Sequence, residues 1–279
     1  MKKLFPQIDS RAARRRFERA AATYADASRL EAEIGVRMLE RLDYLKLAPR
    51  RILDAGSGPS REAGKLSAKY AGAEVIALDF SVGLLRAGRR KLGFFRKNPR
   101  LLCGDLAQLP VAGGAVDLVW SNMALHWTSE PLAVFKEFGR VLAAEGLLMF
   151  STLGPDTLKE LRAAAGAARV HEFIDMHDLG DMLVAAGFSA PVMDMEIVTF
   201  TYRNAGAMLA DLRAGGQTNA RADRARGLGG KDFSKKLHAF LGTRSTFEVV
   251  YGHAWKGAPR KLADGRDIVE FRRAASRFP

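Results

Sequence analysis

Apolar residues along the first 155 positions alternate between short continuous runs and longer segments with helical spacing. Short apolar runs bounded by turn residues indicate buried strands, whereas apolar residues three or four positions apart indicate helices. Strands separated by single helices predict βαβ units and a parallel sheet. The expected strands are 51–54, 74–78, 101–103, 116–121 and 147–152, and the helices expected among them are 61–70, 82–91 and 131–142.

Residues 10–46 precede this alternation and have the apolar spacing of two helices. Ala, Arg and Glu dominate the segment, and Pro49 ends it. We therefore expect an N-terminal helical cap over residues 1–48, ahead of the main domain.

The end of the chain has a different pattern. After helices expected at 156–168 and 178–186, two long strand-like runs appear at 192–202 and 247–255. No short crossover joins them, so we expect an antiparallel pair at the edge of the sheet. The segment 203–245 between them is rich in Gly, Arg and Lys, which favours a lid-like insertion. Its helices are expected at 205–213 and 233–241, within a main domain over 49–256 that is followed by a basic tail over 257–279.

Composition narrows the class of protein. The 279 residues are 48% hydrophobic and 27% charged, as in soluble globular proteins. No apolar run is long enough to cross a membrane, and the N-terminus lacks the apolar core of a secretory signal. The single Cys103 excludes an internal disulfide. We therefore expect a cytoplasmic protein without a membrane partner.

The net charge of +13 fits three interpretations: nucleic acid binding, an acidic protein partner, or solubility alone. The chain has no helix-turn-helix, zinc-finger or aromatic ribonucleoprotein motif, so nucleic acid is not expected. His171 and His177 lie six positions apart, which matches no zinc-binding spacing, so no metal is expected either.

A glycine-rich turn, DAGSGPS at residues 54–60, follows the first expected strand of the sheet and precedes a helix. Gly56 and Gly58 let the backbone turn tightly and approach a ligand, and the helix start offers unpaired N–H groups. Ser60 stands where a dinucleotide fingerprint has its third glycine. The order Asp54-x-Gly-x-Gly suits a ligand with a cationic amino-acid end better than a pyrophosphate.

Polar residues follow the other expected strands at the same edge of the sheet. Asp79 either holds both ribose hydroxyls of a nucleotide or caps the next helix. Asp105 either accepts from the exocyclic amine of adenine or is a loop carboxylate, and Asn122 follows the fourth strand. Ligands of open parallel sheets bind outside the carboxyl ends of the strands, so these positions predict an adenosine-containing ligand.

Five stretches of the chain carry a resemblance to a known family: DAGSGPS at 54–60, ALDFS at 77–81, GDLAQLP at 104–110, VDLVWSN at 116–122 and LAVFKEFGRVLAAEGLLMFST at 132–152. The chain resembles the class I S-adenosyl-L-methionine-dependent methyltransferases. The resemblance implies an α/β, Rossmann-like seven-stranded sheet of order 3-2-1-4-5-7-6 with the last strand antiparallel, N-terminal helices and a helical insertion before the last strand.

The same resemblance implies S-adenosyl-L-methionine as the cofactor. The glycine turn would lie beside the methionine part, the acid ending the second strand would bind ribose, and residues after the third strand would bracket adenine. The implied cofactor-binding residues are Asp54, Gly56, Gly58, Asp79, Phe80, Asp105, Leu106 and Asn122.

A narrower resemblance over residues 11–256 is carried by RRFERAAATYADASRLEAEIGVRMLERL, SNMALHW, FSTLGPDTLKELR, FIDMHDLGDMLVAAGF, DLRAGGQTNA and TFEVVYGHAW. It is to the malonyl-acyl-carrier-protein O-methyltransferase family of biotin synthesis. It implies methylation of a malonyl carboxylate, with malonyl-acyl carrier protein as partner. Ser57 and Ser60 depart from the Cys and Gly common in that turn, and Ser60 is expected to add a side chain next to the cofactor.

Two other functions compete with this interpretation. Parts of the pattern, including the DTLKELR run and the DLG helix, are shared by a methyltransferase-like assembly factor of respiratory complex I that modifies a protein arginine. A nucleic-acid methyltransferase is favoured by charge alone, and SNMALHW replaces the base-flipping motif expected after the fourth strand.

A carboxylate acceptor is already ionised at neutral pH, so its methylation needs orientation and desolvation rather than a general base. Tyr24 is a candidate catalytic residue folded over the cofactor, or a packing aromatic. His126 lies where an acceptor would approach, or is a loop histidine. Arg213 could pair with the malonyl carboxylate, or be an ordinary surface residue. The charges expected to dock an acidic carrier are Arg14, Arg15, Arg16, Arg221, Arg224 and Arg226.

Overall fold

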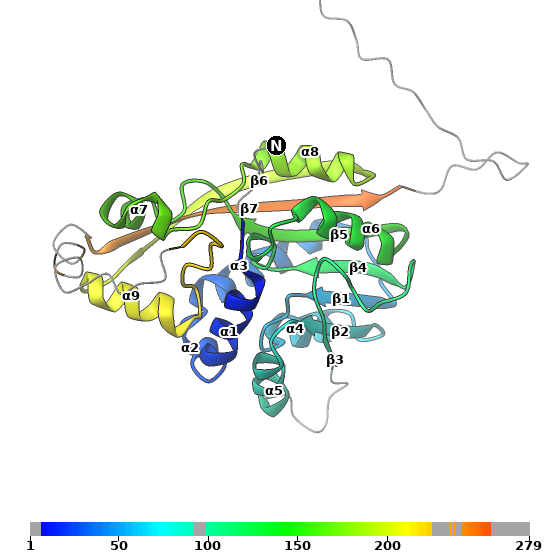
Figure 1. Cartoon of the computed structure of the whole chain (residues 1–279). Helices are drawn as coiled ribbons and strands as arrows, with labels where there is room; N and C mark the ends of the chain where they lie inside the picture. The colour runs from blue at the N-terminus through cyan, green and yellow to red at the C-terminus, as the bar shows by residue number, and fades with distance from the viewer. Residues whose placement is uncertain (1–6, 92–98, 225–234, 236, 238–241, 258–279) are drawn as a thin grey trace, which may run out of the picture.

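The computed structural model describes residues 7–91, 99–224, 235, 237 and 242–257. Their backbone forms a seven-stranded sheet with helices on both faces (Figure 1). The strand order is β3-β2-β1-β4-β5-β7-β6, which confirms the expected architecture. Among the described helices, none is long and apolar enough to cross a membrane.

Five strands run parallel and build the half of the sheet that carries the glycine turn. Each of the five expected strands is confirmed, with ends shifted by a few residues. The parallel strands are β1 (Arg51–Ala55), β2 (Glu74–Asp79), β3 (Arg100–Cys103), β4 (Val116–Ser121) and β5 (Leu142–Leu153). β5 begins earlier than expected because the chain pairs with β4 at Leu142 before a register shift.

The last two strands, β6 (Phe188–Thr201) and β7 (Arg244–Lys256), form the predicted antiparallel pair. β7 also pairs antiparallel with β5, so it lies inside the sheet and is buried over most of its length. Gly252 allows this packing, because a Cβ there would lie 2.4 Å from the ring of Phe150. β6 is the edge strand, and its side chains alternate in exposure.

Side chains of successive strand residues enter two separate cores because a strand alternates its faces. Ile52 and Leu118 pack under α3 (Arg29–Arg41) and α4 (Arg61–Lys69). Their neighbours Leu53 and Val119 pack under α6 (Pro131–Val141) and α8 (Met176–Ala185). α5 (Val82–Lys91) packs against the N-terminal helix α1 (Ser10–Ala20).

The N-terminal cap consists of α1 (Ser10–Ala20), α2 (Tyr24–Ala27) and α3, so the expectation of two helices is wrong in number. The break after α1 coincides with two hydrogen bonds of Thr23. The hydroxyl of Thr23 donates to the carbonyl oxygens of Ala20 at 3.2 Å and of Ala214 at 2.8 Å. A hydroxyl that binds nearby carbonyls competes with continued helix formation. α3 is followed by the short helix η1 (Leu42–Tyr44).

Helix ends in the second half follow backbone and capping geometry. α7 (Lys159–Ala165) starts later than expected because Leu158 has φ +54°. α8 starts earlier because the carboxylate of Asp175 accepts from the backbone N of His177 at 2.8 Å. α9 (Ala205–Ala214) confirms the first helix of the insertion. The helix expected at 233–241, apart from two residues, and the tail after residue 257 lie outside the described residues.

Candidate active site

Two cavities adjoin at the carboxyl ends of the parallel strands. The first, which we call the strand-end cavity, has a volume of about 260 Å³ and includes Gly56, Asp79 and Asn122 in its lining. The second, which we call the arginine cavity, has a volume of about 530 Å³ and lies beside the insertion. Trp127, at the end of η2 (Leu125–Trp127), lines both.

Asp79 holds the glycine turn in place. Its Oδ2 accepts from the backbone N of Gly58 at 2.9 Å, and its Oδ1 accepts from the backbone N of Ser81 at 2.8 Å. Burial raises the pKa of Asp79 to about 6, although these two hydrogen bonds lower it. The next helix is capped by Ser81, whose hydroxyl accepts from the backbone N of Leu84 at 3.2 Å. Each carboxylate oxygen of Asp79 can still accept from a ligand hydroxyl.

The glycines of the turn are required by its geometry. Gly56 has φ +82°, and a Cβ there would lie 2.3 Å from Cβ of Ala124. Gly58 has φ +53° and lies under the ring of Tyr24. A Cβ at Gly58 would lie 3.5 Å from Cε1 of that ring. Ser60 also has a positive φ of +59°, but its buried side chain lies outside the lining of both cavities. The effect of Ser60 on cofactor binding therefore stays a prediction, with no contribution from Ser60 to either lining.

A small void beside the turn, which we call the acidic void, is lined by the buried carboxylates of Asp54 and Glu62 and the half-buried carboxylate of Glu31, together with one cation, Arg61. One oxygen of each, Oδ2, Oε2 and Oε1 respectively, is buried and accepts no hydrogen bond within the described part of the chain. Burial raises the pKa of all three, to about 7 for Glu31 and well above the usual value for Asp54. Unpaired buried carboxylates are costly, so this end of the site favours a cationic ligand group.

The sequence interpretation missed Glu31 and Glu62. Their meeting requires α3 and α4 to approach closely at Gly35, where a Cβ would lie 2.7 Å from Oε1 of Glu62. Gly35, a glycine inside the apolar pattern of a helix, was the available sequence signal, because such a glycine often marks the close approach of another element.

Tyr24 and Asn122 lie between this void and the strand-end cavity, since both residues line both spaces. Burial, followed by the charges of Glu31 and Asp79, raises the pKa of Tyr24 well above its usual value, so its hydroxyl stays protonated. The side-chain amide of Asn122 is hydrogen-bonded within the protein. Its Nδ2 donates to the carbonyl oxygen of Glu31 and its Oδ1 accepts from the hydroxyl of Ser151, both at 2.8 Å.

The other end of the strand-end cavity is lined by Phe80, Asp105 and Leu106, as the sequence predicted for an adenosine site. Oδ1 of Asp105 accepts from the backbone N of Ala107 at 2.9 Å, which fixes the loop. The ring of Phe80 lies 5.7 Å from that of Phe17 on α1, so the cap covers this end.

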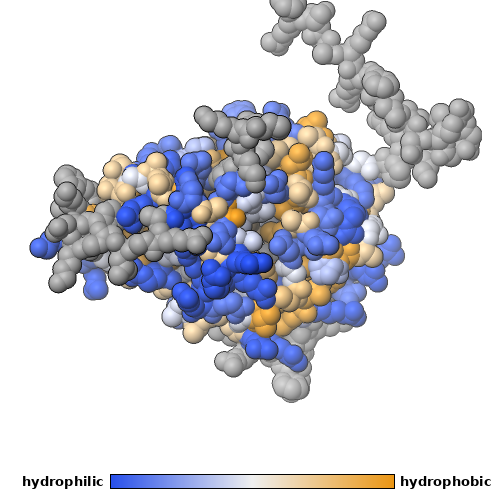
Figure 2. Space-filling view, viewed as in Figure 1, coloured by the Kyte–Doolittle hydropathy of each residue, from blue (hydrophilic) through white to orange (hydrophobic). Residues whose placement is uncertain are grey.

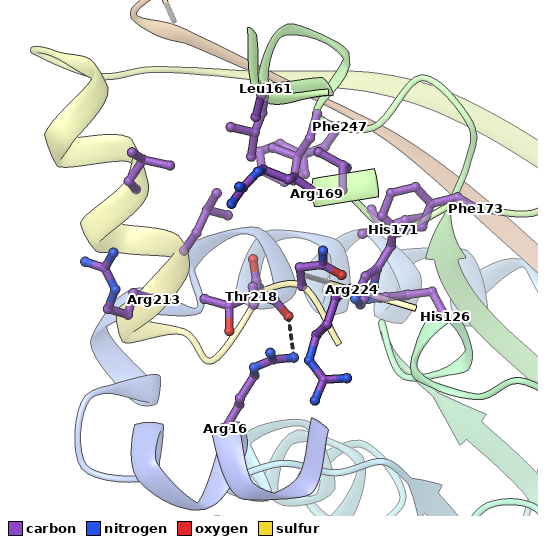
Figure 3. A pocket seen from close by; sticks show the side chains of 18 of the residues that line it. Arg16, His126, Leu161, Arg169, His171, Phe173, Arg213, Thr218, Arg224 and Phe247 are labelled. Atoms are coloured by element: carbon purple, nitrogen blue, oxygen red, sulfur yellow. Dashed lines mark hydrogen bonds between the residues drawn. The ribbon is translucent and has the colours of Figure 1, made fainter. Parts of the chain in front are cut away.

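The arginine cavity gathers positive charge from several elements (Figure 3). Arg16 comes from α1, Arg169 from η3 (Ala167–Arg169), Arg213 from α9 and Arg224 from the end of the described insertion. No Asp or Glu belongs to its lining among the described residues. Burial, followed by repulsion from Arg224, lowers the pKa of Arg16. A cavity lined by several cations and by no described acid favours an anionic ligand.

Two histidines in the same cavity are neutral. Burial, followed by the charge of His171, lowers the pKa of His126 to about 3, and burial lowers that of His171 to about 4. Nε2 of His171 accepts from the backbone N of Ala220 at 2.7 Å, so its proton is on Nδ1. Nδ1 of His126 lies 3.4 Å from the hydroxyl of Thr152.

The structure thus divides the predicted site residues between neighbouring spaces. His126 and Arg213 line the arginine cavity, whereas Tyr24 lines the strand-end cavity and the acidic void. Asp54 lines only the void. Over the described ranges no group of three or more His, Cys, Asp or Glu could hold a metal ion.

Comparison with known proteins gives a consistent family. Residues 53–150 match the model of the methyltransferase domain. A malonyl-acyl-carrier-protein O-methyltransferase of Laribacter hongkongensis is 49% identical, over 94% of this chain and 96% of the relative. One of Methylovorus sp. is 47% identical, over 96% and 97%. The crystal structure of a putative methyltransferase from Bacillus halodurans, 18% identical, has the same fold with a TM-score of 0.60, covering 80% of this chain and 99% of that one.

Ser60→Gly should stabilise the protein. A side chain in the left-handed region costs about 1–2 kcal/mol, and the substitution also removes a buried hydroxyl that accepts no hydrogen bond from the described residues. We expect thermal unfolding to shift upward by a few degrees. Cofactor affinity should not change, because Ser60 lines neither cavity. A lowered midpoint would contradict this account of the turn, and Ser129→Gly is the matched control at a serine whose hydroxyl is hydrogen-bonded.

Proposed function

Because the chain belongs to the malonyl-acyl-carrier-protein O-methyltransferase family, we propose that it methylates the free carboxylate of malonyl-acyl carrier protein at the entry to biotin synthesis. The observation that carries the proposal is the arginine cavity, which has no acid in its described lining and adjoins the strand-end cavity at Trp127. Such a cavity suits an anionic acceptor, and the acidic void beyond the glycine turn suits a cationic donor.

S-adenosyl-L-methionine is the cofactor of this reaction, and it supplies an activated methyl group when bound. The unpaired buried oxygens of Glu31, Asp54 and Glu62 fit its ammonium group. Asp79 would accept from the ribose hydroxyls, beside Phe80. Residues Asp105 and Leu106 would hold adenine, Gly56 and Gly58 would let the ligand approach the turn, and Asn122 would support the lining.

The chain's own residues would orient and desolvate the acceptor. Arg213 is the best candidate to bind the malonyl carboxylate, because its side chain makes no ion pair within the described residues. Arg224, in contrast, is paired with Asp9 at 3.0 Å. Neutral His126 and the protonated hydroxyl of Tyr24 would contact the reactants without changing their charge. No proton has to leave the acceptor, so no general base is needed.

The competing interpretation, modification of a protein arginine by an assembly factor, is not favoured by the site. A guanidinium substrate would have to enter a cavity lined by Arg16, Arg169 and Arg213, beside Arg224, whose charge Asp9 balances. Repulsion among cations at short range would oppose its binding.

We also propose a division of labour along the chain. The cap over residues 1–48 and the insertion over about 203–245 would close over the methyltransferase domain at 49–256. The described contacts support this, since Arg29 on α3 pairs with Asp211 on α9 at 2.9 Å. The basic tail at 257–279 lies outside the described residues except for Gly257.

The carrier would dock on α1. Arg11, Arg14, Arg15 and Arg19 are exposed on this helix, whose Arg16 lines the arginine cavity. Figure 2 shows a hydrophilic area where Figure 1 places α1. This position puts positive charge next to the mouth of the cavity, where an acidic carrier protein would be attracted.

The insertion contributes less to docking than its sequence predicted. Arg221 pairs with Glu172 at 2.8 Å and with Asp223 at 2.7 Å, and its side chain is only 14% exposed. Arg224 is equally buried and is paired with Asp9, while Arg226 lies outside the described residues. Their charges are therefore largely neutralised within the chain, and the proposed docking set shifts to α1.

The reaction itself can be tested with methyl-labelled S-adenosyl-L-methionine and malonyl-acyl carrier protein. We expect a labelled, base-labile methyl ester on the carrier. Arg213→Ala should raise KM for the malonyl substrate about 10-fold or more, because a charge-assisted pair contributes about 1.5–3 kcal/mol. Arg203→Ala, an exposed position outside both linings, is the matched control. Cofactor binding without methyl transfer to any malonyl thioester would refute the proposal.

The docking surface can be tested by reversing charges on α1. Arg14→Glu together with Arg15→Glu should raise KM for malonyl-acyl carrier protein about 10-fold or more, mainly at low ionic strength. KM for malonyl-N-acetylcysteamine should stay within twofold, since that substrate has no protein carrier. Lys46→Glu with Arg50→Glu, exposed at the start of β1, should affect neither substrate. Equal effects of the α1 change on both substrates would place its action in the cavity instead.

The acidic void predicts proton release on cofactor binding. The pKa of Glu31 is about 7 in the free protein, so half of the molecules carry a proton there at that pH. A bound ammonium lowers the pKa, and the proton leaves. Affinity for S-adenosyl-L-homocysteine should therefore rise with pH through about 7 and fall below it. Calorimetry in buffers of different ionisation enthalpy should detect the release at pH 7. It should be smaller in Glu31→Gln, where Asp54 and Glu62 still titrate, and unchanged in Glu33→Gln.

A further inference from the structure

One hydrogen bond connects the two sides of the site. Nε2 of Gln217 donates to Oε1 of Glu31. Gln217 follows α9 and lines the arginine cavity, whereas Glu31 on α3 lines the strand-end cavity and the acidic void. The side chains belong to segments 186 positions apart, so the contact is a product of tertiary folding.

The backbone around Gln217 is held from several directions. Its N donates to the carbonyl oxygen of Leu212 at 2.8 Å, which continues the end of α9. Gly216 has φ +70°, and a Cβ there would lie 3.2 Å from the ring of Phe17 on α1. The carbonyl oxygen of Thr218 accepts from Nη1 of Arg16 at 3.2 Å. The turn thus packs against α1, and its hydrogen bond with Arg16 connects it to another residue that lines the arginine cavity.

We propose that the Gln217–Glu31 hydrogen bond couples the two binding events, so that the amino-acid end of the cofactor orders the 215–220 turn for the acceptor. Gln217 is in this view a positioning residue, acting through the backbone that carries Thr218 and Asn219. The inference rests on the function proposed above, because it assumes a cationic donor on one side and an anionic acceptor on the other.

The physical basis is the charge of Glu31. A carboxylate accepts a stronger hydrogen bond than a protonated carboxyl, because the bond is then charge-assisted. Burial raises the pKa of Glu31 to about 7, although the charge of Arg61 and the hydrogen bond from Gln217 lower it and the charge of Glu62 raises it further. An ammonium group beside Oε2, Oδ2 of Asp54 and Oε1 of Glu62 would keep Glu31 ionised. The bond from Gln217 would then strengthen, and the turn that lines the arginine cavity would lose fewer conformations on binding the acceptor.

Thermodynamic linkage makes the coupling measurable in either direction. Binding of malonyl-acyl carrier protein would be measured with no added ligand, with S-adenosyl-L-homocysteine, and with 5′-methylthioadenosine, which lacks the amino-acid end. In the unmodified protein S-adenosyl-L-homocysteine should tighten carrier binding about fivefold or more. 5′-Methylthioadenosine should change it less than twofold. In Gln217→Leu the tightening by S-adenosyl-L-homocysteine should fall below twofold.

Asn219→Ala is the matched control, because Asn219 lines the same cavity and bonds to Ala168 and Arg221 rather than to the acidic void. It should keep the full coupling factor, whatever its effect on carrier affinity alone. A Gln217→Leu protein with unchanged coupling would overturn the inference, as would equal effects of the two nucleosides. If both ligands bind independently in the unmodified protein, the inference alone fails. If S-adenosyl-L-homocysteine does not bind at all, the proposed function fails with it.

Discussion

The two backbone hydrogen bonds accepted by Asp79 are the constraint on which the site depends. They join the end of β2 to the glycine turn after β1 and to the start of α5. The pairing of β1 with β2 alone would not fix the position of the turn or of the helix. A buried carboxylate is costly unless N–H groups face it, so the turn must present its backbone inward. That requirement explains the positive φ of Gly58 and the close approach of Tyr24 above it. The same carboxylate therefore shapes the turn and provides the acceptor that a ribose would meet.

Around this turn the protein separates charge by sign. Carboxylates of Glu31, Asp54 and Glu62 outnumber the one cation, Arg61, in the void on the β1 side, whereas arginines and no described acid line the cavity beyond Trp127. The ring of Trp127, which lies between the two cavities, packs edge-on against Phe17 and His171, each at 4.9 Å between ring centroids. Residues of the strand-end cavity and of the arginine cavity therefore both hold it in place. With charge arranged in this way, electrostatics would distinguish a cationic methyl donor from an anionic acceptor, as the proposed function requires. Neutral histidines add polarity to the acceptor side without adding a base.

Much of the fold could be predicted from the sequence, because strand and helix periods are local properties. The sheet order came from the resemblance, and the ends of elements depended on contacts that no local pattern contains. Thr23 ends α1 partly by binding Ala214, 191 positions away. The sequence predicted Arg221 and Arg224 to be docking charges. In the folded chain they are paired with Glu172, Asp223 and Asp9, which the sequence pattern does not reveal. Glu31 and Glu62 were missed for the same reason, since each is an ordinary helix-start acid until α3 packs on α4.

The N-terminal helices and the described part of the 203–245 segment contact each other directly, and this limits how the site can assemble. Asp9 shows it most directly: its carboxylate caps α1 by accepting from Ala12, binds Arg224, and its backbone N donates to Ala220. The N-terminal helix is therefore fixed by residues more than 200 positions later, and His171 reaches the same backbone at Ala220. α1 supplies Phe17 to the strand-end cavity and Arg16 to the arginine cavity, so the contacts that hold α1 bear on both spaces. Any shift of α1 changes the lining of both cavities at once. Binding of the donor and binding of the acceptor are therefore expected to depend on each other.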